Sequence, residues 1–244
     1  MEIEYFIPPN DDVWPTFHAT WIDTCWSWLL DIGVCEDYMF KSVHEKNKLA
    51  HYARACTDIT FKFPFGTSEL MGIAARGNYD LTQHSKESGK SLEYFDEESK
   101  NKYLPHVIEP SIGVDRLFLA LLVSAYHEDE IEGEKRTVLR FHPSVAPVKV
   151  SVLPLVKNKP EIVALSRNLF SRLQARYNVE YDTAGAIGRR YRRADEAGTP
   201  FCITIDYESL ENDTVTVRYR DSTQQVRMPI ADIFTFLSKE IDGI

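Results

Sequence analysis

The chain has 244 residues, of which 43% are hydrophobic and 27% charged, a composition typical of globular proteins with one large or two modest cores. No apolar run approaches the roughly 18 residues needed to span a bilayer, which argues against a membrane protein. The net charge of −9 is uneven: residues 1–146 hold 24 acidic and 14 basic side chains, or −10, and residues 147–244 hold 13 and 14, or +1. The acidic first part is unsuited to general nucleic-acid binding, in which phosphate neutralisation dominates.

The N-terminal sequence and the cysteines indicate the cellular compartment. Met1-Glu2-Ile3-Glu4 is acidic and lacks the basic region of a signal peptide. The four cysteines form no CxxC and no close pair: Cys25, Cys35, Cys56 and Cys202. We interpret them as buried, reduced thiols, which predicts a cytoplasmic protein.

The first part of the chain begins with a predicted strand and a predicted helix. Ile3–Ile7 has the pattern of a short strand. Over Trp14–Ile32 apolar residues recur at every third or fourth position, which predicts a helix. We expect Asp11 or Asp12 to cap its start and Gly33 to end it.

Three more strands are predicted further along, at Ile59–Phe63, Glu69–Ala74 and Tyr103–Glu109. The polar stretch Ser85–Lys102 is predicted to be a surface excursion with a turn at Ser88-Gly89-Lys90. This order indicates an antiparallel sheet with helices, an α+β architecture, and not a βαβ series.

The pattern changes around His142–Pro147, where two prolines interrupt it, and we place a domain boundary there. The predicted domains are residues 1–146 and 147–244. In the second, strands and helices follow the order β-α-β-α-β-β-α, which predicts a compact α/β domain with a mixed sheet. Its predicted elements are Val148–Val156, a helix from Pro160 through Leu173, Val179–Asp182, Ile187–Ala197, Phe201–Asp206, Thr214–Tyr219 and a final helix over about Ile230–Ile241.

The segment His106–Arg116 combines chemically active side chains with a change of structure. A short apolar strand is broken at Pro110 and Gly113, and an apolar-periodic helix then runs to about Tyr126. This arrangement would bring a carboxylate, a hydroxyl and an arginine to one small zwitterion and one phosphate, because a helix N-terminus favours anions. The same pattern equally fits an ordinary strand–turn–helix connection.

Four segments of the chain carry recognisable motifs. They are LAHYA at residues 49–53, GTSELMGIAARGNYDL at 66–81, HVIEPSIGVDRLFLALL at 106–122, and GAIGRRYRRADEAGTPF at 185–201. The third resembles motif 3 of a class II aminoacyl-tRNA synthetase, in the form found in the dimeric glycyl-tRNA synthetases. The segment at 66–81 resembles that family's G-x-x-E-L-x-G-I-A-x-R-x-x-x-D-L, and LAHYA at 49–53 agrees with the same family. The segment at 185–201 resembles the signature of the family's anticodon-binding domain. The chain is therefore similar to the family's carboxyl-terminal part, from the end of motif 2 onwards.

The resemblance implies a fold and a reaction. The fold is a partial class II catalytic core built on an antiparallel sheet, followed by an α/β anticodon-binding domain with a mixed sheet. The reaction is that of a glycine–tRNA ligase: the glycine carboxylate attacks the α-phosphate of ATP, and glycine then passes to the terminal ribose of tRNA-Gly. The implied substrates and partners are glycine, ATP with Mg²⁺, tRNA-Gly and, in the full-length family, a second copy in a homodimer.

The resemblance also implies site residues. Those matching the glycine-binding positions are Glu2, Glu109, Pro110, Ser111, Ile112 and Gly113. Those matching the ATP-binding positions are Glu69, Leu70, Gly113, Val114, Asp115 and Arg116. Arg116 and Arg76 match catalytic arginines, and Glu69 is a candidate Mg²⁺ contact. An alternative interpretation makes Arg76 a surface arginine paired with Asp80.

An arginine cluster and a set of histidines are two further candidate binding groups. Arg189, Arg190 and Arg193 are predicted to contact anticodon phosphates, although a solvated helical face fits them as well. The histidines at positions 44, 51, 84 and 106 have no tight ligand spacing, no cysteine companion and no HExxH motif, so no metal site made by the protein alone is predicted.

The chain also departs from the family pattern. Motif 1 and most of motif 2, with its α-phosphate arginine, should lie upstream of Glu2. We interpret the chain as a fragment or as the product of a mis-assigned start codon, and a natural truncated paralogue is the third explanation. Such a chain is expected to be inactive alone. Acidic or polar family positions are replaced at Lys48, Ala75, Gly77, Asn78 and Tyr219. These losses favour the alternative of a non-catalytic, synthetase-like tRNA-binding or accessory protein.

Overall fold

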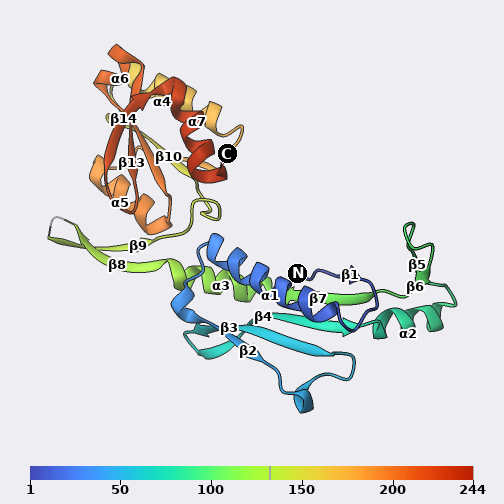
Figure 1. Ribbon diagram of the computed structural model, residues 1–244. Helices are drawn as coiled ribbons and strands as arrows, with labels where there is room; N and C mark the ends of the chain where they lie inside the picture. Colours follow the sequence, from blue (N-terminus) through green and yellow to red (C-terminus); the bar gives the residue numbers. More distant parts are fainter. Residues whose placement is uncertain (132, 244) are drawn as a thin grey trace. The chain divides into compact units, whose positions relative to one another are not determined.

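The computed structural model describes residues 1–131 and 133–243 and consists of two compact units, Met1–Val123 and Ser124–Ile244 (Figure 1). Each unit has its own sheet and its own hydrophobic core. The units divide before the boundary predicted near Ala146, because the hairpin of β8 (Tyr126–Ile131) and β9 (Glu134–Leu139) packs on α5 (Ile187–Ala197) of the second unit.

The first unit is built on a five-stranded sheet in the order β1-β7-β4-β3-β2, in which every neighbouring pair is antiparallel. The predicted antiparallel architecture is therefore confirmed. In chain order the strands are β1 (Tyr5–Ile7), β2 (Met39–Val43), β3 (Ala55–Phe63), β4 (Gly66–Gly77) and β7 (His106–Ile112). The edge strand β2 was not predicted, because its residues alternate weakly and Lys41 and Ser42 are polar.

The two faces of this sheet differ in character. Successive side chains of a strand point to opposite faces, and along β3 the buried residues Ile59 and Phe61 alternate with the half-buried Cys56 and Asp58. Helix α1 (Trp14–Asp31) lies along the apolar face (Figure 1) and packs on β4 and β7. The opposite face carries the polar side chains, and the candidate site is built there.

Helix boundaries in the first unit follow the sequence with one correction. Helix α1 starts after Val13, so neither Asp11 nor Asp12 caps it as predicted. The backbone N–H groups of Val13 and Trp14 donate instead to Asn10 O. Pro15 lies in the first turn, where its missing N–H needs no partner. Gly33 has φ of 92°, as a residue ending a helix in the left-handed region should, which confirms the predicted stop. Helix α3 (Val114–Ala125) follows Gly113 as predicted.

The remaining elements of the first unit surround the predicted surface excursion. Gly89 adopts a left-handed conformation at the end of a helix, where the predicted turn lies. The helix itself and two short strands were not predicted: α2 (Tyr79–Ser88), β5 (Tyr94–Phe95) and β6 (Lys102–Tyr103). Two 3-10 turns complete the unit, η1 (Glu36–Tyr38) and η2 (Lys46–Lys48).

The second unit contains the predicted mixed sheet, in the order β11-β10-β12-β13-β14. Strands β11, β10 and β12 run parallel, whereas β12, β13 and β14 are antiparallel. The elements are β10 (Val150–Pro154), α4 (Pro160–Leu173), β11 (Val179–Tyr181), α5, β12 (Phe201–Ile205), α6 (Tyr207–Asn212), β13 (Thr214–Tyr219), β14 (Gln225–Pro229), η3 (Ile230–Asp232), α7 (Ile233–Leu237) and η4 (Ser238–Asp242). Among the described elements of this unit, α6, β14 and the hairpin strands β8 and β9 were not predicted.

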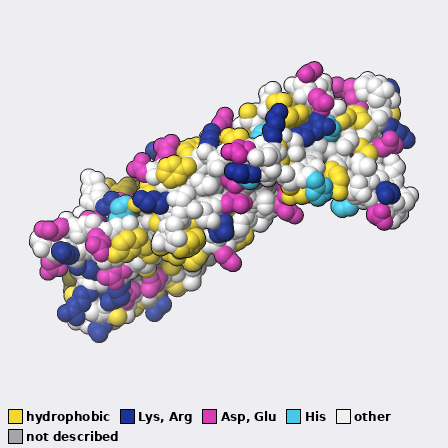
Figure 2. Space-filling model, turned by 90° about the horizontal axis from the view of Figure 1, so that it is seen from below, with side chains coloured by type: hydrophobic (Ala, Val, Ile, Leu, Met, Phe, Trp, Pro, Cys, Tyr) yellow, Lys and Arg dark blue, Asp and Glu magenta, His cyan; other side chains and the backbone are white. Residues whose placement is uncertain are grey.

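The surface carries charges of both signs. On the face seen in Figure 2, acidic and basic side chains are interspersed and small hydrophobic groups lie between them. Across residues 1–131 and 133–243, no helix is both long enough and apolar enough to cross a membrane.

Candidate functional site

The polar face of the first sheet brings Glu2 and Ser111 together. Glu2 forms an isolated antiparallel bridge with Ser111 of β7, and two backbone hydrogen bonds of 2.9 Å flank it, from Ile3 N to Pro110 O and from Ile112 N to Met1 O. Cross-strand partners point to the same face. Glu109 lies two residues before Ser111 on β7 and therefore shares that face. Three of the predicted glycine-binding residues thus converge.

Pro110 and Ile112 are placed differently. They alternate with Glu109 and Ser111 along β7, and both are buried. Their side chains accordingly pack on the apolar side of the sheet, and Ile112 belongs to the core. Their backbone groups pair with the first residues of the chain within the sheet, where Pro110 O accepts from Ile3 N.

Arg76 of β4 is the cation of this face. Its Nη1 donates to the Glu109 carboxylate, and its Nε donates to Asp80 of α2 at 2.7 Å. The guanidinium carbon also lies 4.2 Å from the ring centroid of Tyr52, within cation–π range. Burial tends to lower the pKa of Arg76, but the hydrogen bonds to Asp80 and Glu109 outweigh it and raise the pKa. Arg76 therefore pairs at the same time with Asp80 and with Glu109, which is a predicted glycine-binding residue.

The surroundings of Arg76 are acidic. A cavity of about 450 Å³ is lined by Glu2, Glu4, Asp80, Glu109 and the arginine, with apolar residues and His84 completing it. The pKa of Glu4 is raised by its burial and by the neighbouring charges of Glu109, Glu2 and Asp80, against the opposing effect of Arg76. Four carboxylates against one guanidinium favour a small cationic group, such as an ammonium, in this cavity.

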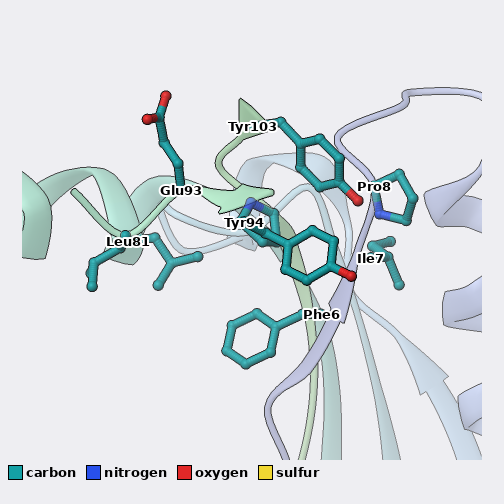
Figure 3. Close-up of a pocket in the computed structure, with 9 residues that line it drawn as sticks. Phe6, Ile7, Pro8, Leu81, Glu93, Tyr94 and Tyr103 are labelled. Atoms are coloured by element: carbon teal, nitrogen blue, oxygen red, sulfur yellow. The ribbon is translucent and has the colours of Figure 1, made fainter. Parts of the chain in front are cut away.

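An apolar cavity adjoins the acidic one, since Phe6 and Leu81 line both. It measures about 600 Å³, and Figure 3 shows Phe6, Tyr94 and Tyr103 around it with Ile7 and Pro8. This cavity was not predicted from the sequence. The available signal was the pair of tyrosines at the hairpin of β5 and β6, within and just after a stretch otherwise interpreted as a polar surface excursion.

The predicted nucleotide residues lie around the start of α3. Arg116 is exposed, and its Nη1 donates to the backbone carbonyl of Glu69 on β4. Glu69, Gly113, Val114 and Asp115 are exposed as well. Leu70 is only 1% exposed, so its side chain belongs to the core and its backbone alone can contact a ligand. The helix start, the guanidinium and an exposed carboxylate are the groups that a metal-bound phosphate requires.

The arginines of α5 in the second unit are not equivalent. Arg190 is 4% exposed and donates to the backbone carbonyls of Pro154, Leu155 and Asp182. It therefore holds the helix to the end of β10, and the prediction that it contacts phosphates is wrong for this conformation. Arg189 and Arg193 are exposed, although Arg193 is paired with Asp182.

Known proteins similar to the chain agree with this architecture. Residues 149–240 match the protein family described as "Anticodon binding domain". The chain is 47% identical over 242 residues to the glycine–tRNA ligase of Clostridium kluyveri, 48% over 242 residues to that of Lysinibacillus sphaericus, and 46% over 241 residues to that of Bacillus anthracis. These alignments cover 99% of this chain but 51%, 51% and 52% of the relatives. The chain thus spans about half the length of the curated relatives it matches.

The antiparallel sheet of the first unit is therefore followed by a domain that matches anticodon binding domains. The chain is a homologue of about half of the glycine–tRNA ligase sequence.

Proposed function

We propose that the chain supplies the glycine-binding and motif 3 side of a glycine–tRNA ligase, which adenylates glycine with ATP and transfers it to tRNA-Gly. The observation that carries the proposal is the convergence of Glu2, Glu109 and Ser111 on one face of the sheet beside Arg76. The identity to glycine–tRNA ligases supports the same substrate.

Each group has a role suited to its charge. The carboxylates of Glu109 and Glu2 and the Ser111 hydroxyl accept hydrogen bonds from the glycine ammonium, since charge-assisted bonds are the stronger class. Arg76, held by Glu109 and Asp80, directs its remaining donor capacity toward the glycine carboxylate. Glycine offers no side chain, so selection depends on excluding larger amino acids. A methylene is worth only about 1–3 kcal/mol in an apolar pocket, whereas a filled pocket excludes it sterically.

The nucleotide side works by positioning and charge stabilisation. A glycine carboxylate oxygen attacks the α-phosphorus of ATP and pyrophosphate leaves. Arg116 stabilises phosphate charge at the start of α3, where the helix dipole has the same effect. The exposed Glu69 carboxylate would hold Mg²⁺, which neutralises phosphate charge when bound.

The second unit is proposed to bind the anticodon of tRNA-Gly, as the matched family's description suggests. Arg189 and Arg193 are the phosphate contacts we propose. A homodimer of the whole protein in the cytoplasm completes the proposal.

A second candidate is a synthetase-like protein that binds tRNA, or serves as an accessory subunit, without forming an adenylate. The observation favouring it is the sequence around Arg76, where Ala75, Gly77 and Asn78 carry no carboxylate at positions that are acidic or polar in the family. The two candidates differ in whether the polar face of the first sheet takes part in glycine adenylation.

A chimera separates them. This chain would replace the matching half of the Clostridium kluyveri glycine–tRNA ligase, and glycine-dependent ATP–pyrophosphate exchange would be measured. We expect the chimera to catalyse exchange and the isolated chain to catalyse none. The donor that the other half supplies is the motif 2 arginine, and loss of one donor to a developing phosphate charge typically lowers the rate about 10²–10³-fold. A folded chimera that binds tRNA-Gly but catalyses no exchange would favour the second candidate.

A further inference from the structure

A histidine, a cysteine and an aspartate meet at the edge of the first sheet. His44 Nε2 lies 2.7 Å from Asp58 Oδ2, and Cys56 Sγ lies 3.6 Å from Asp58 Oδ1. One nitrogen, one sulfur and one carboxylate oxygen of the three residues all lie within 4.8 Å of one another. This cluster has no part in the proposed glycine or nucleotide site.

The backbone holds the three residues in register. Cys56 and Asp58 are two positions apart on β3 and so point to the same face of the sheet. His44 follows the last residue of β2, and its backbone N–H donates to Cys56 O at 3.0 Å. Strand pairing at Val43 and Thr57 fixes the histidine beside the other two. The arrangement therefore rests on rigid elements and not on a loose loop, as a preorganised site requires.

Space remains on the open side of the cluster. Gly72 of β4 pairs with Asp58, and a Cβ at that position would lie 3.5 Å from Asp58 Oδ1 and 3.4 Å from Glu69 Oε1. Gly72 thus adds no side chain beside the Asp58 carboxylate, and the Glu69 carboxylate borders the same space. The His44 and Asp58 side chains are 33% and 15% exposed, so the cluster is sheltered yet reachable from solvent.

We propose that His44, Cys56 and Asp58 bind a zinc-class divalent cation. Imidazole nitrogen, thiolate sulfur and carboxylate oxygen are the three ligand types that Zn²⁺ takes, whereas Mg²⁺ prefers oxygen alone. Three protein ligands leave a fourth tetrahedral position for water. The ion would join the end of edge strand β2 to β3 and stiffen the polar face of the sheet.

Zinc binds sulfur as the thiolate and imidazole through a nitrogen that carries no proton. The Cys56 thiol proton therefore passes to solvent as the Zn–S bond forms.

Co²⁺ is the spectroscopic probe for the test, with Zn²⁺ as competitor. The metal-free full chain would be titrated with Co²⁺ while the thiolate-to-cobalt charge-transfer absorption is recorded. We expect one equivalent to bind, Zn²⁺ to displace it, and Cys56→Ser to abolish the band and weaken binding by more than about 100-fold. Cys35→Ser is the matched control and should retain both. No stoichiometric binding, or an unchanged band in Cys56→Ser, would overturn the proposal.

A measurement on the unmodified chain covers the case in which Cys56→Ser fails to fold. The four cysteines would be alkylated with and without Zn²⁺ and mapped by mass spectrometry. We expect Zn²⁺ to protect Cys56 and to leave the alkylation of Cys35 unchanged. Equal alkylation of Cys56 in both samples would show that the cluster is a His–Asp pair beside an inert thiol.

Discussion

Glu109 and Arg76, 33 residues apart in the chain, form an ion pair across neighbouring strands β7 and β4. Their side chains are 11% and 20% exposed, so the pair is sheltered from water and its geometry is held by the sheet. Arg76 is held from the other side by Asp80. The consequence is that Glu109 has two functions in the proposed site: it accepts from the substrate ammonium, and it fixes the arginine that receives the substrate carboxylate.

Loss of either hydrogen-bonding group should weaken glycine use. In the chimera, Glu109→Gln or Ser111→Ala is expected to lower kcat/KM for glycine. The matching loss of transition-state stabilisation is about 1.5–3 kcal/mol for each change, the value of a hydrogen bond to a charged group. Steady-state ATP–pyrophosphate exchange at varied glycine concentration measures the effect. Glu93→Gln, a change beside the apolar cavity, is the matched control and should be silent. Wild-type glycine kinetics in a folded Glu109→Gln protein would remove Glu109 from the site.

The second unit depends on a buried carboxylate. Asp195 accepts hydrogen bonds from Arg218 at 2.7 and 2.9 Å and from Arg136 of β9 at 2.8 Å, and all three residues are buried. Asp195→Asn would leave the buried Arg218 guanidinium without its counter-ion and would remove one of the two counter-ions of Arg136, which keeps Asp129. We expect it to lower the free energy of unfolding by about 3–5 kcal/mol, as breaking a buried pair does. Urea unfolding measures this, and the exposed neighbour change Glu196→Gln should cost little.

Which parts of the structure were predictable depends on the origin of each contact. Helix α5 was predicted with its observed ends because local periodicity and Gly198 define it. That Arg190 faces inward depends on the carbonyls of Pro154 and Leu155, at and just after the end of β10 and 36 and 35 residues earlier, which no local pattern reveals. Similarly, His44 and Cys56 meet only because β2 pairs with β3, and β2 has too weak a pattern to be recognised.

The hairpin of β8 and β9 was missed for a different reason. Its sequence is dominated by charged residues, and strands usually favour β-branched and aromatic ones. Ion pairs supply part of what apolar burial supplies elsewhere, since Asp129 pairs with Arg136 and Arg140. On the polar face of the first unit, in contrast, the motifs alone indicated Glu109, Ser111 and Arg76, and the structure brings these three residues together.

Acid should destabilise the second unit through Asp129. The hydrogen bond from Arg136 lowers the pKa of Asp129 to about 2, despite the opposing effect of burial. A carboxylate with a depressed folded-state pKa contributes stability above its ordinary pKa of 3.8 and loses it as the pH falls through about 2. The free energy of unfolding is therefore expected to fall between about pH 4 and pH 2. Asp129→Asn should flatten this part of the profile. Glu130→Gln, an exposed change on the same strand, should leave the slope unchanged.

Charge reversal on α5 tests the proposed tRNA contact. Arg189→Glu with Arg193→Glu should weaken binding of tRNA-Gly to the full chain more than Lys157→Glu with Lys159→Glu does, because the arginines lie on the proposed contact surface. Affinity should fall as salt rises, and the slope of that dependence should decrease by about 1.4 when two phosphate contacts to a single-stranded loop are lost. Arg190 is left unchanged, since its burial would turn a charge reversal into unfolding. Filter binding at several salt concentrations measures both quantities, with circular dichroism confirming that each variant is folded. Equal losses from the two pairs would mean that α5 is a solvated face and that tRNA binds elsewhere on the unit.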